Sequence, residues 1–131
     1  MTNHHKSTRR FYVMHRTLMD RVPELFRDTP MSKLQGVTRR VLAAHPGLRC
    51  SVVAGKGDRY ATGGETWFVS YAQDGRVVLA RHQRNVGVLL HELAHVIEPR
   101  ASHGPVFINR YLQLLADFGD VPMGRILGGL F

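Results

Sequence analysis

Apolar residues in the first third of the chain recur at helical spacing. Over residues 8–27 they roughly follow a period of 3.6 and predict a first helix, which Pro23 breaks or kinks. Thr29 and Pro30 mark a turn or a helix start, and a second amphipathic helix follows until His45 and Pro46. The apolar positions of these two helices are Phe11, Leu18, Val22, Leu25, Phe26, Leu34, Val37, Val41 and Leu42.

The middle of the chain changes to the pattern of short strands. Residues 50–54 form a short segment centred on two β-branched valines, which predicts a strand. The glycines and charges of 55–64 predict a loop. Residues 66–72 (TWFVSYA) predict a strand, and Asp74 and Gly75 are a tight-turn signal before its partner at 77–80. Short strands that follow one another predict antiparallel pairing.

Helical spacing returns at Asn85 and continues to Pro99. A last long helix is predicted from about Pro105 to Phe118, and the apolar tail 122–131 predicts a final packed turn. The expected fold is therefore α+β, with two N-terminal helices, a three-stranded, mainly antiparallel sheet, a helix carrying candidate chemistry and a C-terminal helix. A length of 131 residues is typical of one domain, so we expect residues 1–131 to form a single domain.

The helix predicted over residues 86–98 has two unlike faces. Leucines, valines and an isoleucine form one broad arc that should bury against the sheet, and Gly87 and Ala94 leave room beside the other arc. That other arc carries the polar side chains His91, Glu92, His95 and Glu98. Histidines four residues apart stack one turn above the other, so two imidazoles can reach one zinc ion.

The spacing of His91, Glu92 and His95 is the H-E-x-x-H arrangement, in which the glutamate acts as general base on a metal-bound water. Catalytic zinc sites generally take three protein ligands, so a third ligand should come from a returning segment. Pro99 ends the helix, and residues 100–102 are just long enough to turn the chain back. His103 then lies just before the next helix, which begins at Pro105. The sequence thus predicts Zn²⁺ bound by three histidines.

This stretch also resembles a known group of enzymes. His91 to His95 (HELAH), followed by His103 to Phe107 (HGPVF), resembles the zincin metallopeptidases of the SprT-like and WLM type, and small metallohydrolases of unknown substrate. The resemblance covers about residues 86–111. It implies a small zincin-like domain and a peptidase in which His91, His95 and His103 bind zinc and Glu92 is the catalytic base. SprT proteins often add a cysteine-rich zinc ribbon, which a single cysteine rules out here.

Three further residues are candidates around the site. Glu98 either orients His95 or is simply solvated, and the first is favoured because metal-bound histidines usually need an acceptor on the other ring nitrogen. Tyr111 lies two turns after His103 and either points towards the site or belongs to the apolar stripe of its helix. His82 is either a neighbour of the ligands or a surface-loop residue. The resemblance to zincins also implies an edge strand that holds an extended peptide substrate, and the segment 66–72 or the segment 77–81 could be that strand. The remaining histidines have no spacing that forms a site, namely His4, His5, His15 and His45.

Composition adds expectations about compartment and partners. Cys50 is the only cysteine, which excludes an intramolecular disulfide and fits a reducing cytoplasm. The chain has no apolar run long enough to span a membrane and no apolar signal-peptide core after its basic start, so no membrane partner is expected.

The formal net charge of +8 favours acidic partners such as nucleic acid. The competing interpretation is therefore a non-catalytic module that binds nucleic acid or protein, in which zinc holds the last two helices together. Its basic face would come from the arginines of the first two helices, Arg9, Arg10, Arg16, Arg39 and Arg40.

Overall fold

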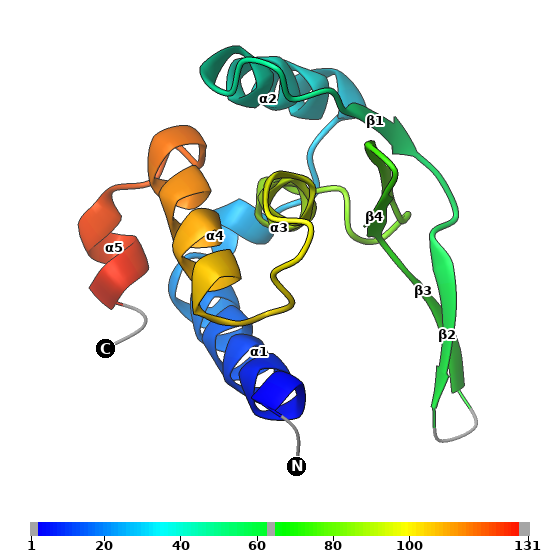
Figure 1. Cartoon of the computed structure of the whole chain (residues 1–131), viewed down its shortest axis with the longest axis vertical. Helices are drawn as coiled ribbons and strands as arrows, with labels where there is room; N and C mark the ends of the chain where they lie inside the picture. Colours follow the sequence, from blue (N-terminus) through cyan, green and yellow to red (C-terminus); the bar gives the residue numbers. More distant parts are fainter. Residues whose placement is uncertain (1–2, 63–64, 129–131) are drawn as a thin grey trace.

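The N-terminal helices form largely as the apolar spacing predicts. A computed structural model describes residues 3–62 and 65–128, apart from the side chains of 3–10, 12, 58–62 and 65–68. Helix α1 spans Asn3–Arg21 and is followed by a single 3₁₀ turn, η1, at Pro23–Phe26. The break falls where Pro23 stands, because proline has no N–H to continue the helical ladder. Helix α2 spans Met31–Ala44, and Figure 1 places it on the far side of the molecule from α1.

The β region contains more strands than the pattern predicts. The strands are β1 (Ser51–Ala54), β2 (Asp58–Thr62), β3 (Glu65–Val69), β4 (Tyr71–Gln73) and β5 (Arg76–Leu79). The predicted loop at 55–64 is therefore wrong in part, since β2 lies within it and pairs with β3 as an antiparallel ribbon. This ribbon projects away from the helices (Figure 1).

The strand predicted at 66–72 divides at Ser70. The Ser70 N–H donates to Oε1 of Gln83 at 2.6 Å, and the Ser70 hydroxyl oxygen accepts from the Ala80 N–H at 2.8 Å. These side-chain bonds replace the ladder at that residue, so β3 joins the ribbon while β4 joins β5. The turn between β4 and β5 has positive φ at both Asp74 and Gly75, which confirms the predicted tight turn.

The main sheet is mixed, with strand order β1-β5-β4. Strand β5 is antiparallel to β4 and parallel to β1, so the expectation of a mainly antiparallel sheet is not confirmed. The reason is topological: the chain reverses once between β2 and β3 and again between β4 and β5, and two reversals restore the direction of β1. What stands is an α+β fold whose strands follow two helices and precede three.

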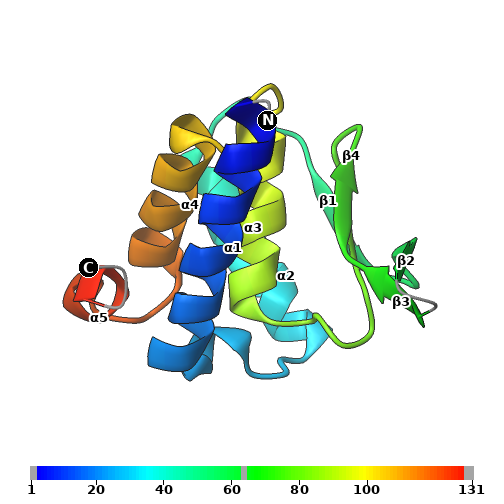
Figure 2. The same ribbon diagram turned by 90° about the horizontal axis from the view of Figure 1, so that it is seen from below.

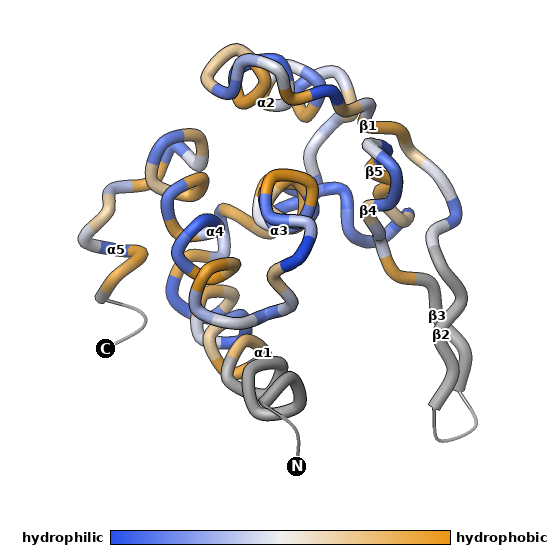
Figure 3. The backbone as a smooth tube through the Cα atoms, in the orientation of Figure 1, coloured by the Kyte–Doolittle hydropathy of each residue, from blue (hydrophilic) through white to orange (hydrophobic). Residues whose placement is uncertain are grey.

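Helix α3 (Val86–Ile97) is the central element, and it contacts α4, β4, β5, η1 and α2. Figure 2 shows α3 between α1 in front and α2 behind, and Figure 3 shows its run of apolar residues inside the ring of other elements. The Asn85 side chain caps its first turn by accepting from the Val88 N–H at 2.8 Å. The apolar arc therefore packs mainly among helices, with the sheet covering only one flank.

The C-terminal helices complete the core. Helix α4 spans Pro105–Phe118 and α5 spans Met123–Gly128, so the predicted final turn is a short helix. The predicted apolar stripe of α4 is confirmed, since all five of its residues are buried, namely Phe107, Tyr111, Leu114, Leu115 and Phe118. In the part of the chain that the structure describes, no helix combines the length and the hydropathy needed to cross a membrane.

Gly87 does not leave room beside the polar face of α3, as the sequence suggested. A Cβ built on Gly87 would lie 2.4 Å from the ring of Phe26, so the glycine is required for the close approach of η1 to α3. Ala94 is likewise fully buried. The small residues of α3 therefore serve helix packing and not an open space.

We predict opposite effects for two glycine-to-alanine changes. Gly87→Ala should destabilise the fold by about 1–3 kcal/mol, because the added methyl group forces Phe26 out of place. Gly36→Ala, in the interior of α2, should stabilise it by about 0.5–1 kcal/mol, because the nearest atom to its new Cβ is the end of Arg39 at 3.8 Å. Urea unfolding measures both, and equal signs would contradict the packing described here.

Candidate metal site

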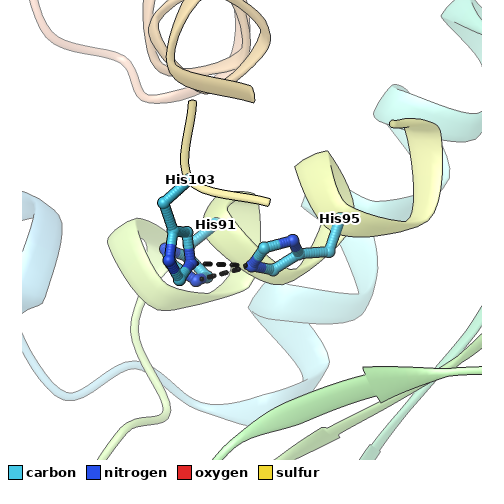
Figure 4. A group of neighbouring side chains, drawn as sticks. All are labelled: His91, His95 and His103. Carbon is cyan, nitrogen blue, oxygen red and sulfur yellow. Dashed lines mark hydrogen bonds between the residues drawn. The ribbon is translucent and has the colours of Figure 1, made fainter. Parts of the chain in front are cut away.

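Three histidine rings converge on one point beside α3. His91 and His95 project from successive turns of α3, and His103 comes from the segment before α4 (Figure 4). The Nε2 atom of His95 lies 3.1 Å from Nε2 of His91 and 3.1 Å from Nε2 of His103. The candidate ligand atoms of all three residues lie within 4.8 Å of one another. The structure thus brings together the three histidines that the sequence singles out.

Hydrogen bonding alone cannot account for this convergence. Nε2 of His95 carries either one proton or one lone pair, so it can make a hydrogen bond to only one of its two neighbours at a time. A shared cation removes the conflict, because all three nitrogens can then direct lone pairs to it. Ligand nitrogens about 2.0–2.1 Å from a tetrahedral zinc ion are about 3.3 Å apart, close to the spacing seen here.

The local chain path explains how His103 reaches the pair. Helix α3 ends at Ile97, and the segment from Pro99 turns back before α4 begins at Pro105. The Ala101 N–H donates to the Glu98 carbonyl oxygen at 3.2 Å, which closes the turn. Proline is favoured in a first helical turn, so the sequence fixes both ends of the reversal.

Aromatic rings hold two of the histidines by stacking. Phe11 of α1 stacks on His103, with ring centroids 4.4 Å apart and planes at 13°. Phe107 of α4 stacks on His95 at 4.3 Å and 25°. Phe11 also lies 4.8 Å from the ring of His91, at a tilt. The ring planes are therefore set by apolar neighbours from helices at both ends of the chain.

Burial keeps His91 and His95 neutral. It lowers the pKa of His91 well below its usual value, and the neighbouring His95 and His103 lower it further. Burial also lowers the pKa of His95 to about 4, with a smaller contribution from His103. A neutral imidazole has the lone pair that a metal needs, so at neutral pH the site is ready to bind a cation without first releasing protons.

Glu92 lies next to the three rings and is itself buried. Its side chain is part of a residue that is 6% exposed, and its Oε1 atom is 3.7 Å from Nε2 of His91. Burial raises the pKa of Glu92 to about 8. A bound cation would favour the charged carboxylate and lower that pKa again. The geometry places Glu92 beside the candidate metal position and outside the set of three ligands.

A cavity of about 1130 Å³ opens in front of these residues. One wall is α3, with Val88, Glu92 and Val96, and another is strand β4 with the turn that follows it. The third wall is α1, which contributes Phe11 and His15. Sequence spacing did not place Phe11 or His15 at the site. The one sequence feature that links them is their separation of four residues, which puts them on the same face of their helix.

The other sequence candidates have different roles. The Glu98 carboxylate accepts from the Arg110 guanidinium at 2.9 and 3.0 Å, so it is held towards α4 rather than towards His95. Tyr111 is fully buried, and its hydroxyl donates to the Gly87 carbonyl oxygen at 3.0 Å, as a core tyrosine would. His82 is exposed and does not line the cavity. His45 bonds to the Val41 carbonyl oxygen through Nδ1, and the side chains of His4 and His5 lie outside the described residues.

The arginines predicted to form one basic face are divided between two sides of the molecule. Arg16 belongs to α1, whereas Arg39 and Arg40 belong to α2, and α3 lies between the two helices (Figures 1 and 2). All three are exposed, and Arg40 is 4.0 Å from Asp120. The side chains of Arg9 and Arg10 lie outside the described residues. The described arginines of these helices therefore do not gather into a single surface.

Comparison of the chain with protein-family models, with curated proteins and with solved structures found no significant match. The site is therefore interpreted from its own geometry.

We predict that the three histidines bind one zinc ion per chain. Titration of metal-depleted protein with zinc should raise its melting temperature, with a gain of about 2.7 kcal/mol when free zinc is 100 times the Kd. His103→Ala should weaken zinc binding by more than about 100-fold. Loss of a residue that only hydrogen-bonds to a metal ligand already weakens binding by about 10–100-fold, and loss of a ligand should cost more. His82→Ala is the matched control, because His82 is a nearby exposed histidine, and it should bind zinc as the wild type does. Equal affinities in all three proteins would contradict the site.

We also predict that the metal-free protein loses stability as the pH rises from 6.5 to 8. In that range folded Glu92 keeps its proton, because its pKa is about 8, whereas unfolded Glu92 titrates near 4.5. The folded state then holds the extra proton, so raising the pH favours unfolding by about 2 kcal/mol over this interval. The lowered histidine pKa values have the opposite slope, but only below about 6.5. Urea unfolding with a chelator should show the decline in the wild type and not in Glu92→Gln. Saturating zinc should remove it.

Proposed function

We propose that the protein is a zinc-dependent metallopeptidase with a zincin-like domain. The observation that carries this proposal is the convergence of three imidazole nitrogens beside a buried glutamate on the wall of a large cavity. Each part has a role in hydrolysis: three ligands, a base and a space for the substrate. The proposal agrees with the resemblance of residues 86–111 to SprT-like and WLM-type zincins.

Zinc fits this donor set. Catalytic zinc sites commonly use three protein ligands and leave a further position open for water or substrate, and three neutral imidazoles are one such set. Bound there, zinc would polarise a peptide carbonyl and lower the pKa of water towards about 7. The candidate ligands line the cavity directly, so a substrate could reach the open position.

Glu92 supplies the proton transfers. As the oxygen of the attacking water bonds to the carbonyl carbon, the Glu92 carboxylate accepts the proton that this water loses. As the carbon–nitrogen bond then breaks, Glu92 returns that proton to the leaving nitrogen, so the glutamate ends in its starting state. Its buried position on the cavity wall keeps solvent from competing for the proton.

Strand β4 is the best place for an extended peptide to bind. It lies at the edge of the main sheet, where its one partner among the described strands is β5, and residues 70–75 line the cavity. Strand β5 has partners on both sides, so the segment 77–81 cannot add another strand. A substrate backbone paired with β4 would run between the sheet and the histidines. We therefore propose protein or peptide substrates, with nucleic acid as a further partner of the exposed arginines.

Glu92→Gln tests the mechanism. We expect this variant to retain one zinc ion per chain and to lose peptidase turnover, by at least about 100-fold, because general base catalysis contributes 10²–10⁴-fold. Cleavage of unstructured protein substrates should be measured with and without DNA. Glu98→Gln is the matched control, since Glu98 ends the same helix but is bound by Arg110, and it should remain active.

Two results would contradict the proposal. Full turnover in Glu92→Gln would remove the proposed base. One zinc ion per chain together with salt-sensitive DNA binding, and no cleavage of any substrate, would favour a non-catalytic module with a structural zinc ion.

A further inference from the structure

His15 faces the candidate site from a helix far away in the sequence. Its ring lines the same cavity as the three candidate ligands and lies 6.5 Å from the ring of His91, centroid to centroid. It is not one of the three convergent ligands. It is also the one polar side chain among the described α1 residues that line this cavity.

The position of the His15 ring is fixed by two phenylalanines. Phe26 contacts it edge-on, with centroids 5.1 Å apart, and Phe11 lies 5.7 Å away on the same face of α1. These two phenylalanine rings offer the imidazole nitrogens no hydrogen-bond partner. The ring is therefore held in position while part of its hydrogen-bonding capacity is unused.

The surroundings of His15 also select its tautomer. Nδ1 is buried and has no hydrogen-bond partner among the described residues. A proton on Nδ1 would be a buried donor without an acceptor, which is unfavourable. The other ring nitrogen, Nε2, makes no hydrogen bond to the described residues either. It is not among the buried unpartnered atoms, so it is accessible from the cavity. The proton of the neutral ring therefore belongs on Nε2, where a ligand in the cavity can accept it.

His15 and Glu92 approach the candidate metal position from opposite sides. On α3, Glu92 lies about 80° round the helix from the line between His91 and His95, and Gly87 lies about 60° round in the other direction. The Glu92 side is continued by Val88 and Val96, which line the cavity with β4. The Gly87 side meets Phe26, the same ring that contacts His15. A carbonyl bound between these two sides would have the base on one and a donor on the other.

We propose that His15 is a catalytic residue that donates a hydrogen bond from Nε2–H to the carbonyl oxygen of the scissile peptide bond. This inference rests on the proposed peptidase function. As water adds to the carbonyl carbon, the electron pair of the C=O bond moves to oxygen, and a donor already in place stabilises that negative charge. His15 keeps its proton throughout and forms no covalent bond.

Amide side chains offer a sharp test, because each mimics one ring nitrogen. In His15→Gln the amide nitrogen reaches the position of Nε2, whereas in His15→Asn it reaches only that of Nδ1. We expect kcat to fall about 10²–10³-fold in His15→Asn, with KM changed little, and to be largely restored in His15→Gln. His45→Asn, at a histidine outside the cavity, is the control and should leave kcat unchanged.

Two further measurements do not depend on turnover. Nitrogen-15 NMR of the metal-free protein should show the His15 ring as the neutral Nε2–H tautomer. A phosphinic dipeptide, whose tetrahedral anion imitates the reacting carbonyl, should bind zinc-loaded wild type and His15→Gln more tightly than His15→Asn, by about 10-fold or more.

The outcomes separate this assignment from the proposed function. A wild type that binds no zinc and cleaves no substrate counts against the peptidase. An active wild type with equal kcat in both His15 variants overturns the role of His15 alone. The assignment also fails if His15→Asn is as active as His15→Gln, if the ring is the Nδ1–H tautomer, or if phosphinate affinity is the same in all variants or absent. A loss of zinc that parallels the loss of kcat would make His15 a structural residue and overturn it too.

Discussion

The constraint on which the site depends is the close approach of three imidazole nitrogens in apolar surroundings. Phe11 and Phe107 stack on His103 and His95, and burial lowers the pKa of His91 and of His95, which keeps those two rings uncharged. Lone pairs held 3.1 Å apart repel one another unless a proton or a cation lies between them. A cation bound by all three nitrogens would remove that repulsion, and the packing around α3 holds the rings in place.

The rest of the molecule can be understood as support for that arrangement. Asn85 caps the start of α3, Tyr111 ties its first turn to α4, and Gly87 lets η1 approach its other side. Arg110 binds Glu98 where the helix ends, just before the chain turns back. The helix that carries His91 and His95 is therefore held at both ends by contacts that leave its histidine face on the cavity.

Local signals in the sequence were enough to predict that His91, His95 and His103 lie together. His91 and His95 are one helical turn apart, and Pro99 and Pro105 bound the reversal that returns His103, so spacing alone determines their meeting. The helices and their buried stripes follow from periodicity for the same reason. The division at Ser70 could not be predicted, because it depends on hydrogen bonds from Gln83 and Ala80 that form only in the folded chain. The pairing of Glu98 with Arg110 could not be predicted for the same reason, since Arg110 lies on another helix.

The walls of the cavity other than α3 could not be predicted from local spacing either. Phe11 and His15 come from α1, about eighty residues before His91, and no spacing rule links positions so far apart. The parallel pairing of β1 with β5 is also a property of the whole chain path. It leaves β4 at the sheet edge, beside the histidines, although the sequence offered two candidate edge segments.

The distribution of the site along the chain has a consequence for the order of folding. The three histidines lie within residues 91–103, so closing the loop between them requires little loss of chain entropy. Docking of α1 joins segments that are far apart, and contacts of that range form late because their loops are long. A metal ion could therefore be captured by a helix and a turn while the third wall is still open. The last step of folding would then be the docking of α1, which completes the cavity beside the three histidines.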